Sequence, residues 1–199
     1  ISGGATARPF ITHHNTLDID MYMRIATELN LKRLIVGGLE RVYEVGRIFR
    51  NEGMDTRHNP EFTTVELYEA FADFNDMMDL FEDLLSGAAK DICGGYQVRW
   101  QGEDIDLTPG WPRLTMAEAV KQHLGVDFMA ITDDAEAVAA TKGVGVDMDG
   151  VEPTWGHALY ECFDQKVEGK LVQPTFITMH PVDVSPLAKR SPKDPRITE

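Results

Sequence analysis

The sequence is poor in cysteine, in basic residues and in long apolar runs. Its two cysteines are too few for a disulfide framework or, by themselves, for a four-ligand zinc site, and they favour a reducing compartment. No run approaches the roughly 18 apolar residues that a membrane helix needs, so we expect no membrane-spanning segment. The sequence has 19 basic and 33 acidic residues, which gives a formal net charge of −14. This balance argues against a general nucleic-acid coat, but it permits a locally positive pocket for a phosphorylated small molecule.

What remains is an ordinary globular composition. The chain has 199 residues, of which 43% are hydrophobic and 26% charged, and this predicts one domain, or one domain with a small appendage. The first residue is Ile1, no charged-then-apolar signal segment follows it, and residues 194–199 show no closing helix or strand. The sequence therefore predicts a piece of a longer protein.

Two strands and a long polar loop are the clearest local prediction. Residues 42–50 are rich in β-branched and aromatic side chains, and residues 61–68 alternate as a strand does. The stretch between them contains glycine, asparagine and proline, so we expect an antiparallel hairpin with a long loop. The alternation places four residues of the second strand on one face, namely Phe62, Thr64, Glu66 and Tyr68.

The other elements predict an α+β fold with an antiparallel sheet flanked by helices. Residues 31–36 are expected to form one or two helical turns that Gly37 and Gly38 end, while 21–29 fits a strand or a helix equally well. A helix over residues 75–91 is expected to bury Met77, Met78 and nearby aromatics in the core. The remaining expectations are an extended segment at 10–13, a strand pair at 97–107, helices at 115–123, 133–141 and 153–168, and extended chain at 173–178.

The face of the second strand combines an aromatic ring, a hydroxyl, a carboxylate and a phenol. Arg50 ends the partner strand, and Glu52 follows two residues later. One interpretation is a ladder of cross-strand ion pairs between Arg50, Glu52 and Glu66 on a solvated face. The other is a site for a cationic, phosphate-bearing ligand, with Arg50 on a phosphate, Phe62 under a base and Glu66 on an ammonium. Spacing alone leaves both interpretations open.

Several motifs together resemble the class II aminoacyl-tRNA synthetases, and most closely the bacterial-type lysyl-tRNA synthetases. Residues 49–53 (FRNEG), 57–63 (RHNPEFT) and 66–68 (ELY) resemble motif 2 of that class. Residues 3–10 (GGATARPF), 31–38 (LKRLIVGG), 174–178 (PTFIT) and 185–188 (SPLA) are similar to the same family. The resemblance is dense over 3–86 and 171–190 and weaker between, and the long ungapped run makes it specific. It favours a ligand site over the ion-pair ladder.

The resemblance implies a role for each candidate residue. Arg50 would be the catalytic residue, contacting the α-phosphate of ATP and the carboxylate of lysine. ATP would also be held by Glu52, His58, Asn59 and Phe62, with Phe62 stacked on adenine. Lysine would be surrounded by Gly4 (through its backbone), Glu28, Glu66 and Tyr68. Lysine carries two ammonium groups, which match the two carboxylates, whereas an aspartate-specific site is disfavoured.

The resemblance also implies the reaction and its partners. The lysine carboxylate would attack the α-phosphorus in line, giving lysyl-adenylate and pyrophosphate, and the 3′ end of tRNA(Lys) would then take the lysyl group. Arg50 and Mg²⁺ would neutralise the charge at phosphorus, so no side-chain nucleophile is needed. The parent enzyme is expected to be a cytoplasmic homodimer without a membrane partner.

The family's pattern is matched only in part. An N-terminal barrel domain, motif 1, motif 3 and the C-terminal acidic Mg²⁺ ligands have no counterpart in these residues, so we expect no metal ligand in this chain and no charging of tRNA by this chain alone. Residues 1–112 would be a partial catalytic core with its hairpin at about 42–70, residues 113–169 a small helical insertion, and residues 170–199 a return strand of the core. Two alternatives are a paralogue that lysylates a different acceptor and a non-catalytic binding module.

The remaining chemically notable residues have simpler interpretations. His13 and His14 are adjacent on a predicted strand and would point to opposite faces, which disfavours a shared metal. Asp133 and Asp134 are typical of a helix N-terminus. The two cysteines have no activating histidine nearby in sequence, and residues 143–145 (GVG) lack the context of a phosphate loop.

Overall fold

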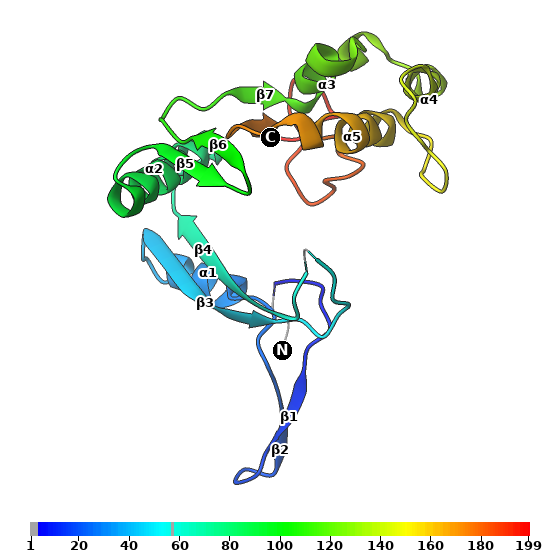
Figure 1. Cartoon of the computed structure of the whole chain (residues 1–199). Helices are drawn as coiled ribbons and strands as arrows, with labels where there is room; N and C mark the ends of the chain where they lie inside the picture. Colours follow the sequence, from blue (N-terminus) through cyan, green and yellow to red (C-terminus); the bar gives the residue numbers. More distant parts are fainter. Residues whose placement is uncertain (1–3, 57) are drawn as a thin grey trace. The chain divides into compact units, whose positions relative to one another are not determined.

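The computed structural model describes residues 4–56 and 58–199. Gly3 and Arg57, which belong to the motifs above, lie outside the described residues. The chain forms two compact units, Ile1–Asp73 and Phe74–Glu199 (Figure 1). Every candidate site residue belongs to the first unit. None of the helices in the described parts of the chain is long and apolar enough to cross a membrane.

The first unit consists of two hairpins and one helix. Its elements in chain order are β1 (Ile11–His14), β2 (Ile19–Tyr22), α1 (Glu28–Val36), β3 (Arg41–Phe49) and β4 (Glu61–Glu69). β1 pairs antiparallel with β2, and β3 pairs antiparallel with β4 over nine residues each. α1 packs against both strands of the β3–β4 hairpin. It ends where the amide of Gly37 donates to the carbonyl of Arg33 at 2.9 Å and where Gly38 takes a φ of +98°.

The β3–β4 hairpin confirms the strand prediction and its alternation. Arg41 lies opposite Glu69 and Phe49 opposite Glu61, so the register is regular along the whole pair. Phe62, Thr64, Glu66 and Tyr68 are all half-buried on one face, as their spacing predicts. The segment of uncertain preference at 21–29 divides into the end of β2, a short connection and the start of α1.

The second unit places helices around a short parallel strand pair. Its elements are α2 (Phe74–Cys93), β5 (Gln97–Trp100), β6 (Glu103–Asp106), β7 (Arg113–Thr115), α3 (Met116–Leu124), η1 (Phe128–Ala130), α4 (Asp134–Gly143), α5 (Trp155–Lys166), η2 (Glu168–Lys170) and β8 (Phe176–Thr178). β5 and β6 form an antiparallel pair, whereas β7 runs parallel to β8, and the paired residues are 63 positions apart in the sequence.

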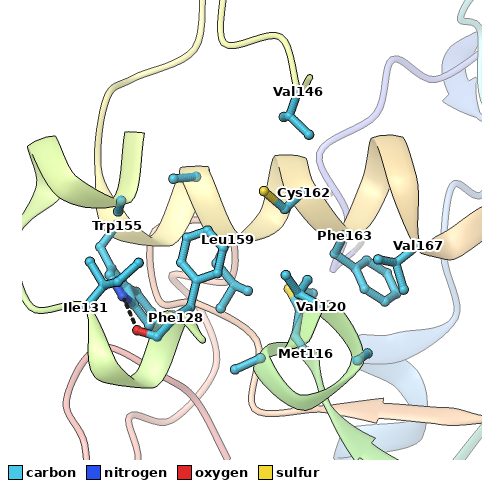
Figure 2. Close-up of a cluster of buried hydrophobic side chains, with 14 residues drawn as sticks. Met116, Val120, Phe128, Ile131, Val146, Trp155, Leu159, Cys162, Phe163 and Val167 are labelled. Carbon is cyan, nitrogen blue, oxygen red and sulfur yellow. Dashed lines mark hydrogen bonds between the residues drawn. The ribbon is translucent and has the colours of Figure 1, made fainter. Parts of the chain in front are cut away.

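The core of the second unit lies between α3, η1 and α5 (Figure 2). Met116, Val120, Phe128 and Leu159 are fully buried there. The indole of Trp155 packs edge-on to Phe128, with ring centroids 6.3 Å apart, and its Nε1 donates to the carbonyl of Phe128 at 2.9 Å. The hydrogen bond satisfies the polar atom that burying a tryptophan brings into a core.

Local signals for helix ends in this unit are confirmed. Asp133 caps α4 by accepting a hydrogen bond from the amide of Glu136 at 3.0 Å, and Asp134 accepts one from the amide of Trp155 at 2.8 Å. Thr115 and Glu118 form a reciprocal capping box at the start of α3. Residues 143–145 lie at the C-terminal end of α4 and do not open a helix.

Two expectations about packing need correction. A mixed helix and strand fold with small antiparallel sheets is confirmed, but the described strands form four separate two-stranded pairs, one of which is parallel. The aromatics near Met77 and Met78 are not core residues: Met78 is buried, whereas Phe81 on the same helix is 46% exposed. An apolar stripe predicts that a helix has a face to bury, but it does not identify what covers that face. The proposed division into 1–112, 113–169 and 170–199 stays a prediction.

Candidate functional site

The candidate site occupies one face of the β3–β4 hairpin, which we call the inner face. It carries the half-buried or buried even-numbered residues of both strands, namely Val42, Glu44, Gly46, Ile48, Phe62, Thr64, Glu66 and Tyr68. Because strand residues two apart share a face, this surface is continuous from the first to the last of them. The N-terminal turn of α1 and the segment before it run along this face.

Glu66 is held by two neutral donors. The phenol of Tyr68 donates to its Oε2 at 3.2 Å, and the amide of Thr27 donates to its Oε1 at 3.3 Å. Thr27 itself is buried, and its hydroxyl has no hydrogen-bond partner among the described residues. Thr27 thus binds Glu66 through its amide while its own buried hydroxyl stays unsatisfied, which is uncommon for a buried polar group.

Glu28 closes the same end of the inner face and contacts Gly4. A Cβ added to Gly4 would lie 2.7 Å from Glu28 Oε2 and 2.8 Å from its Cβ, so the backbone of Gly4 rests directly on this side chain. Glu28 also forms an ion pair with Lys32, one helical turn further along α1. Burial, together with the charges of Glu66 and Glu28, raises the pKa of Tyr68 to about 12. The phenol therefore remains a hydrogen-bond donor at neutral pH.

A second carboxylate faces Glu66 across the hairpin, and it is neutralised by an arginine. Glu44 is the direct partner of Glu66 in the ladder, and it forms an ion pair with Arg24. Arg24 also donates from Nε to the carbonyl of Arg47 at 2.8 Å. Its guanidinium lies across the backbone of Gly46, where any side chain would collide with it. Two carboxylates opposite one another destabilise a hairpin unless a cation compensates one of them.

Arg50 and Phe62 lie together at the other end of the inner face. The Arg50 guanidinium lies 5.3 Å from the centroid of the Phe62 ring, and its Nε donates a long hydrogen bond of 3.4 Å to the carbonyl of Ile25. The Arg50 amide donates to the carbonyl of Pro60 at 2.8 Å, which fixes the residue at the end of the strand pair. Within 4–56 and 58–199, no ion pair joins Arg50 to Glu52 or Glu66, so the cross-strand ladder is not formed.

The loop that joins β3 to β4 carries the remaining candidates. Glu52 accepts a hydrogen bond from the amide of Arg8 at 3.4 Å. His58 contacts the carboxylate of Asp55 through its Nδ1 and its amide, and Asn59 accepts a hydrogen bond from the amide of Glu61 at 3.4 Å. The side chains of Glu52, His58 and Asn59 are all exposed. Each of them contacts a different neighbour, and among the described residues no hydrogen bond or ion pair joins one of the three to another.

The structure thus separates the predicted residues into three groups. Gly4, Glu28, Glu66 and Tyr68 meet at one end of the inner face, Arg50 and Phe62 meet at the other, and Glu52, His58 and Asn59 stay in the loop. Phe62 and Glu66, one from each end, are four residues apart on β4, a span of about 13 Å at the rise of a β-strand. The inner face is therefore long enough for a ligand with two chemically different ends.

The described residues offer no metal centre. No group of three or more histidine, cysteine, aspartate or glutamate side chains in 4–56 and 58–199 could hold a metal ion. His13 contacts Asp18 and Asp20, whereas His14 accepts a hydrogen bond from the amide of Leu17. The described residues therefore do not supply the cluster of oxygen ligands that a Mg²⁺ site needs.

Two other features of the chain do not belong to the inner face. A cavity of about 670 Å³ in the first unit is lined by β2, by residues 23–26 and by one side of α1, and none of the predicted site residues lines it. Cys93 is exposed and Cys162 is buried, where burial raises the pKa of its thiol to about 11. A raised pKa leaves little thiolate at neutral pH, which agrees with an inert Cys162.

Sequence reasoning missed four residues that organise the site. Lys32 was detectable, because it follows Glu28 at the i,i+4 spacing of a helical ion pair. Glu44 shares its parity with Gly46 and Ile48 on β3, but its position opposite Glu66 depends on the hairpin register, which the long loop does not fix. Arg24 and Thr27 lie outside regular secondary structure, and no local pattern indicated that they contact the hairpin.

Comparison with known proteins identifies the class to which this hairpin belongs. The family model for class II tRNA synthetases (D, K and N) matches residues 1–199. The chain therefore belongs to the class II tRNA synthetase family.

Individual relatives show which members of this family the chain is similar to. The lysine–tRNA ligase of Staphylococcus haemolyticus (strain JCSC1435) is 57% identical over all 199 residues, and that of Staphylococcus aureus (strain Mu3 / ATCC 700698) is 56% identical over the same length. In both cases the match covers the whole of this chain and 40% of the relative, so the chain spans less than half the length of these ligases.

Proposed function

We propose that this chain is part of a lysine–tRNA ligase and that its inner face binds lysine and ATP end to end for the formation of lysyl-adenylate. The observation that carries the proposal is the separation of charge along the β3–β4 hairpin. Two carboxylates and a phenol lie at one end, and an arginine on an aromatic ring lies at the other. The names of the relatives, which are lysine–tRNA ligases at 56–57% identity, support the same substrates.

Lysine fits the carboxylate end on electrostatic grounds. Its two ammonium groups would be bound by Glu28 and Glu66, and the Tyr68 phenol and the backbone of Gly4 would complete the pocket. A buried or half-buried carboxylate is stable only with a cationic or hydrogen-bonding partner, and a ligand with two cations supplies one for each. The amide of Thr27 already donates to Glu66, so it would hold this carboxylate in place for the ligand.

ATP fits the other end. The Phe62 ring is a platform for the adenine base, and the Arg50 guanidinium beside it presents two parallel N–H groups to an α-phosphate and to the lysine carboxylate. Glu52, His58 and Asn59 would hold the nucleotide from the loop, which needs to close over it. The side chains of these three residues are exposed and therefore accessible to a ligand.

The reaction needs no nucleophile from the protein. The lysine carboxylate would attack the α-phosphorus of ATP, a carboxylate–phosphorus bond would form, and pyrophosphate would leave. Arg50 would stabilise the negative charge that gathers on the phosphorus oxygens, and the two ends of the inner face would hold the reactants in line. The lysyl group would then pass to tRNA(Lys) in the whole protein.

The same proposal places the chain in a larger enzyme. We propose that residues 1–112 and 170–199 belong to its catalytic core, with the hairpin in a larger antiparallel sheet flanked by helices, and that 113–169 is a helical insertion. The Mg²⁺ ligands, the further lysine contacts and the homodimer interface would come from the part of the relatives' length that this chain does not span. On its own the chain would not charge tRNA.

The test is lysine-dependent ATP–pyrophosphate exchange in the full-length protein, with Glu66→Gln as the variant. Loss of the charge on Glu66 should raise the lysine KM or lower kcat by a large factor, since it removes a charge-assisted hydrogen bond to an ammonium. The matched control is Glu61→Gln, on the same strand but on the opposite, exposed face, where Glu61 pairs with Arg47. Equal effects of the two changes, or none, would contradict the role of Glu66.

A further inference from the structure

The side chain of Lys32 reaches into the carboxylate end of the inner face. Its ammonium forms an ion pair with Glu28 and lies 5.7 Å from the centroid of the Tyr68 ring. Glu28 and Tyr68 are two of the four groups to which the proposed function assigns lysine. The ammonium of Lys32, a residue of the protein itself, therefore already occupies part of the pocket proposed for the ligand lysine.

Charge balance explains why this ammonium is there. Three carboxylates gather at this end, and Glu44 is compensated by Arg24. Glu66 receives only the neutral donors Thr27 and Tyr68 among the described residues, whereas Glu28 is paired with the ammonium of Lys32. Without Lys32 and without a ligand, the half-buried Glu28 and Glu66 would both lack a cationic partner in the described part of the chain, and like charges close together repel one another.

A free lysine carries two ammonium groups, each with the same charge as the ammonium of Lys32. With its carboxylate directed to Arg50, its two ammonium groups are matched by Glu28 and Glu66 alone. If Lys32 stayed in place, three ammonium groups would share two carboxylates, and like charges at such short range cost affinity. Lys32 has an exposed route out, because its side chain is 53% exposed on the surface of α1.

We propose that Lys32 is an intramolecular occupant of the lysine pocket: it pairs with Glu28 when the pocket is empty and swings to solvent when lysine binds. The inference rests on the proposed function and adds to it a residue that sets lysine affinity. The Glu28–Lys32 pair is lost on binding, so its strength is subtracted from the affinity for lysine. Lys32 touches neither ATP nor the reacting atoms in this scheme, and kcat should depend on it little.

The alternative role for Lys32 is that of a clamp, a residue that stays paired with Glu28 when lysine binds. In that case Lys32 would hold the Glu28 carboxylate in position while lysine binds beside it. The two roles predict opposite effects of removing the ammonium, since an occupant competes with lysine whereas a clamp assists it.

The experiment measures lysine affinity in the full-length protein for Lys32→Met, Lys32→Arg and the control Arg33→Met. Arg33 is the next residue on α1, and its guanidinium donates a hydrogen bond to the side chain of Asn30 at 3.1 Å. Equilibrium binding of lysine and the lysine KM in ATP–pyrophosphate exchange are both measured. We expect Lys32→Met to lower the lysine Kd and KM about twofold to fivefold, the range of a half-exposed ion pair, with kcat and the KM for ATP unchanged.

Lys32→Arg is expected to change lysine affinity in the opposite direction to Lys32→Met. A guanidinium forks onto a carboxylate more firmly than an ammonium does, so this variant should raise the lysine Kd and KM. A higher KM in Lys32→Met, or the same KM in all variants, overturns the proposal. Absence of lysine binding and of exchange in the unmodified full-length protein would instead contradict the proposed function, so the two failures are distinguishable.

Discussion

Replacing Gly4 with alanine tests whether the contact between Gly4 and Glu28 positions lysine. Gly4 has a φ of +84°, in the left-handed region that favours glycine. The added Cβ would also lie 2.8 Å from the Cβ of Glu28, closer than two carbon atoms approach without displacement. The side chain of Glu28 cannot avoid this contact by rotating, because its own Cβ is fixed by α1.

The magnitude follows from the backbone. A left-handed conformation costs a residue other than glycine about 1–2 kcal/mol, and the collision with Glu28 adds to it. Residue 4 precedes the first strand, so the segment should move away from Glu28 and release the strain. Its backbone contact with lysine would then be lost. We expect the lysine KM of the full-length protein to rise about fivefold to thirtyfold, which corresponds to the same 1–2 kcal/mol.

The assay is ATP–pyrophosphate exchange at varied lysine and at varied ATP, with Gly38→Ala as the matched control. Gly38 has a φ of +98°, and a Cβ added there meets no described atom within 4 Å. The control carries the same backbone penalty without the contact, so it should lower the melting temperature and leave the lysine KM unchanged. A wild-type lysine KM in Gly4→Ala, or an equal rise in Gly38→Ala, would refute the reasoning.

Three further predictions concern Arg50, Phe62 and Tyr68. Arg50→Ala should abolish adenylate formation and Arg50→Lys should not restore it, since a point charge does not fork across two oxygens; near-normal exchange in the lysine variant would remove Arg50 from the reaction. Phe62→Leu should weaken ATP binding by about 1 kcal/mol, read as a fivefold rise in the KM for ATP, and a lysine KM that rises instead would place the ring elsewhere. Because the pKa of Tyr68 is raised to about 12, its contribution to stability should be complete below pH 10 and lost as the pH rises toward 12. Absorbance titration against Tyr68→Phe measures this, and ionisation of Tyr68 near pH 10 would contradict it.

The sequence contains enough information to predict the hairpin and most helices, because these depend on local patterns. Alternation alone places Glu66 and Tyr68 on one face, and Gly37 and Gly38 end α1 through a backbone preference that no tertiary contact needs to supply. The pairing of β7 with β8 was not predictable in this way. Strands of three residues carry almost no periodicity, and the paired residues, such as Arg113 and Phe176, are 63 positions apart in sequence.

The candidate site shows the same limit on a smaller scale. A motif identifies side chains that a strand presents, but not the residues that arrive from elsewhere to neutralise them. Glu44 and Glu66 face each other only because of the hairpin register, and that juxtaposition is tolerated because Arg24 reaches Glu44 across the bare backbone of Gly46. Glycine in the middle of a strand is unfavourable by itself, so its presence there indicates a close approach by another group. Gly46, Arg24 and Glu44 therefore act together: the glycine makes room for the arginine, and the arginine neutralises Glu44. Glu66 is then the carboxylate of this pair that is available to a cationic ligand.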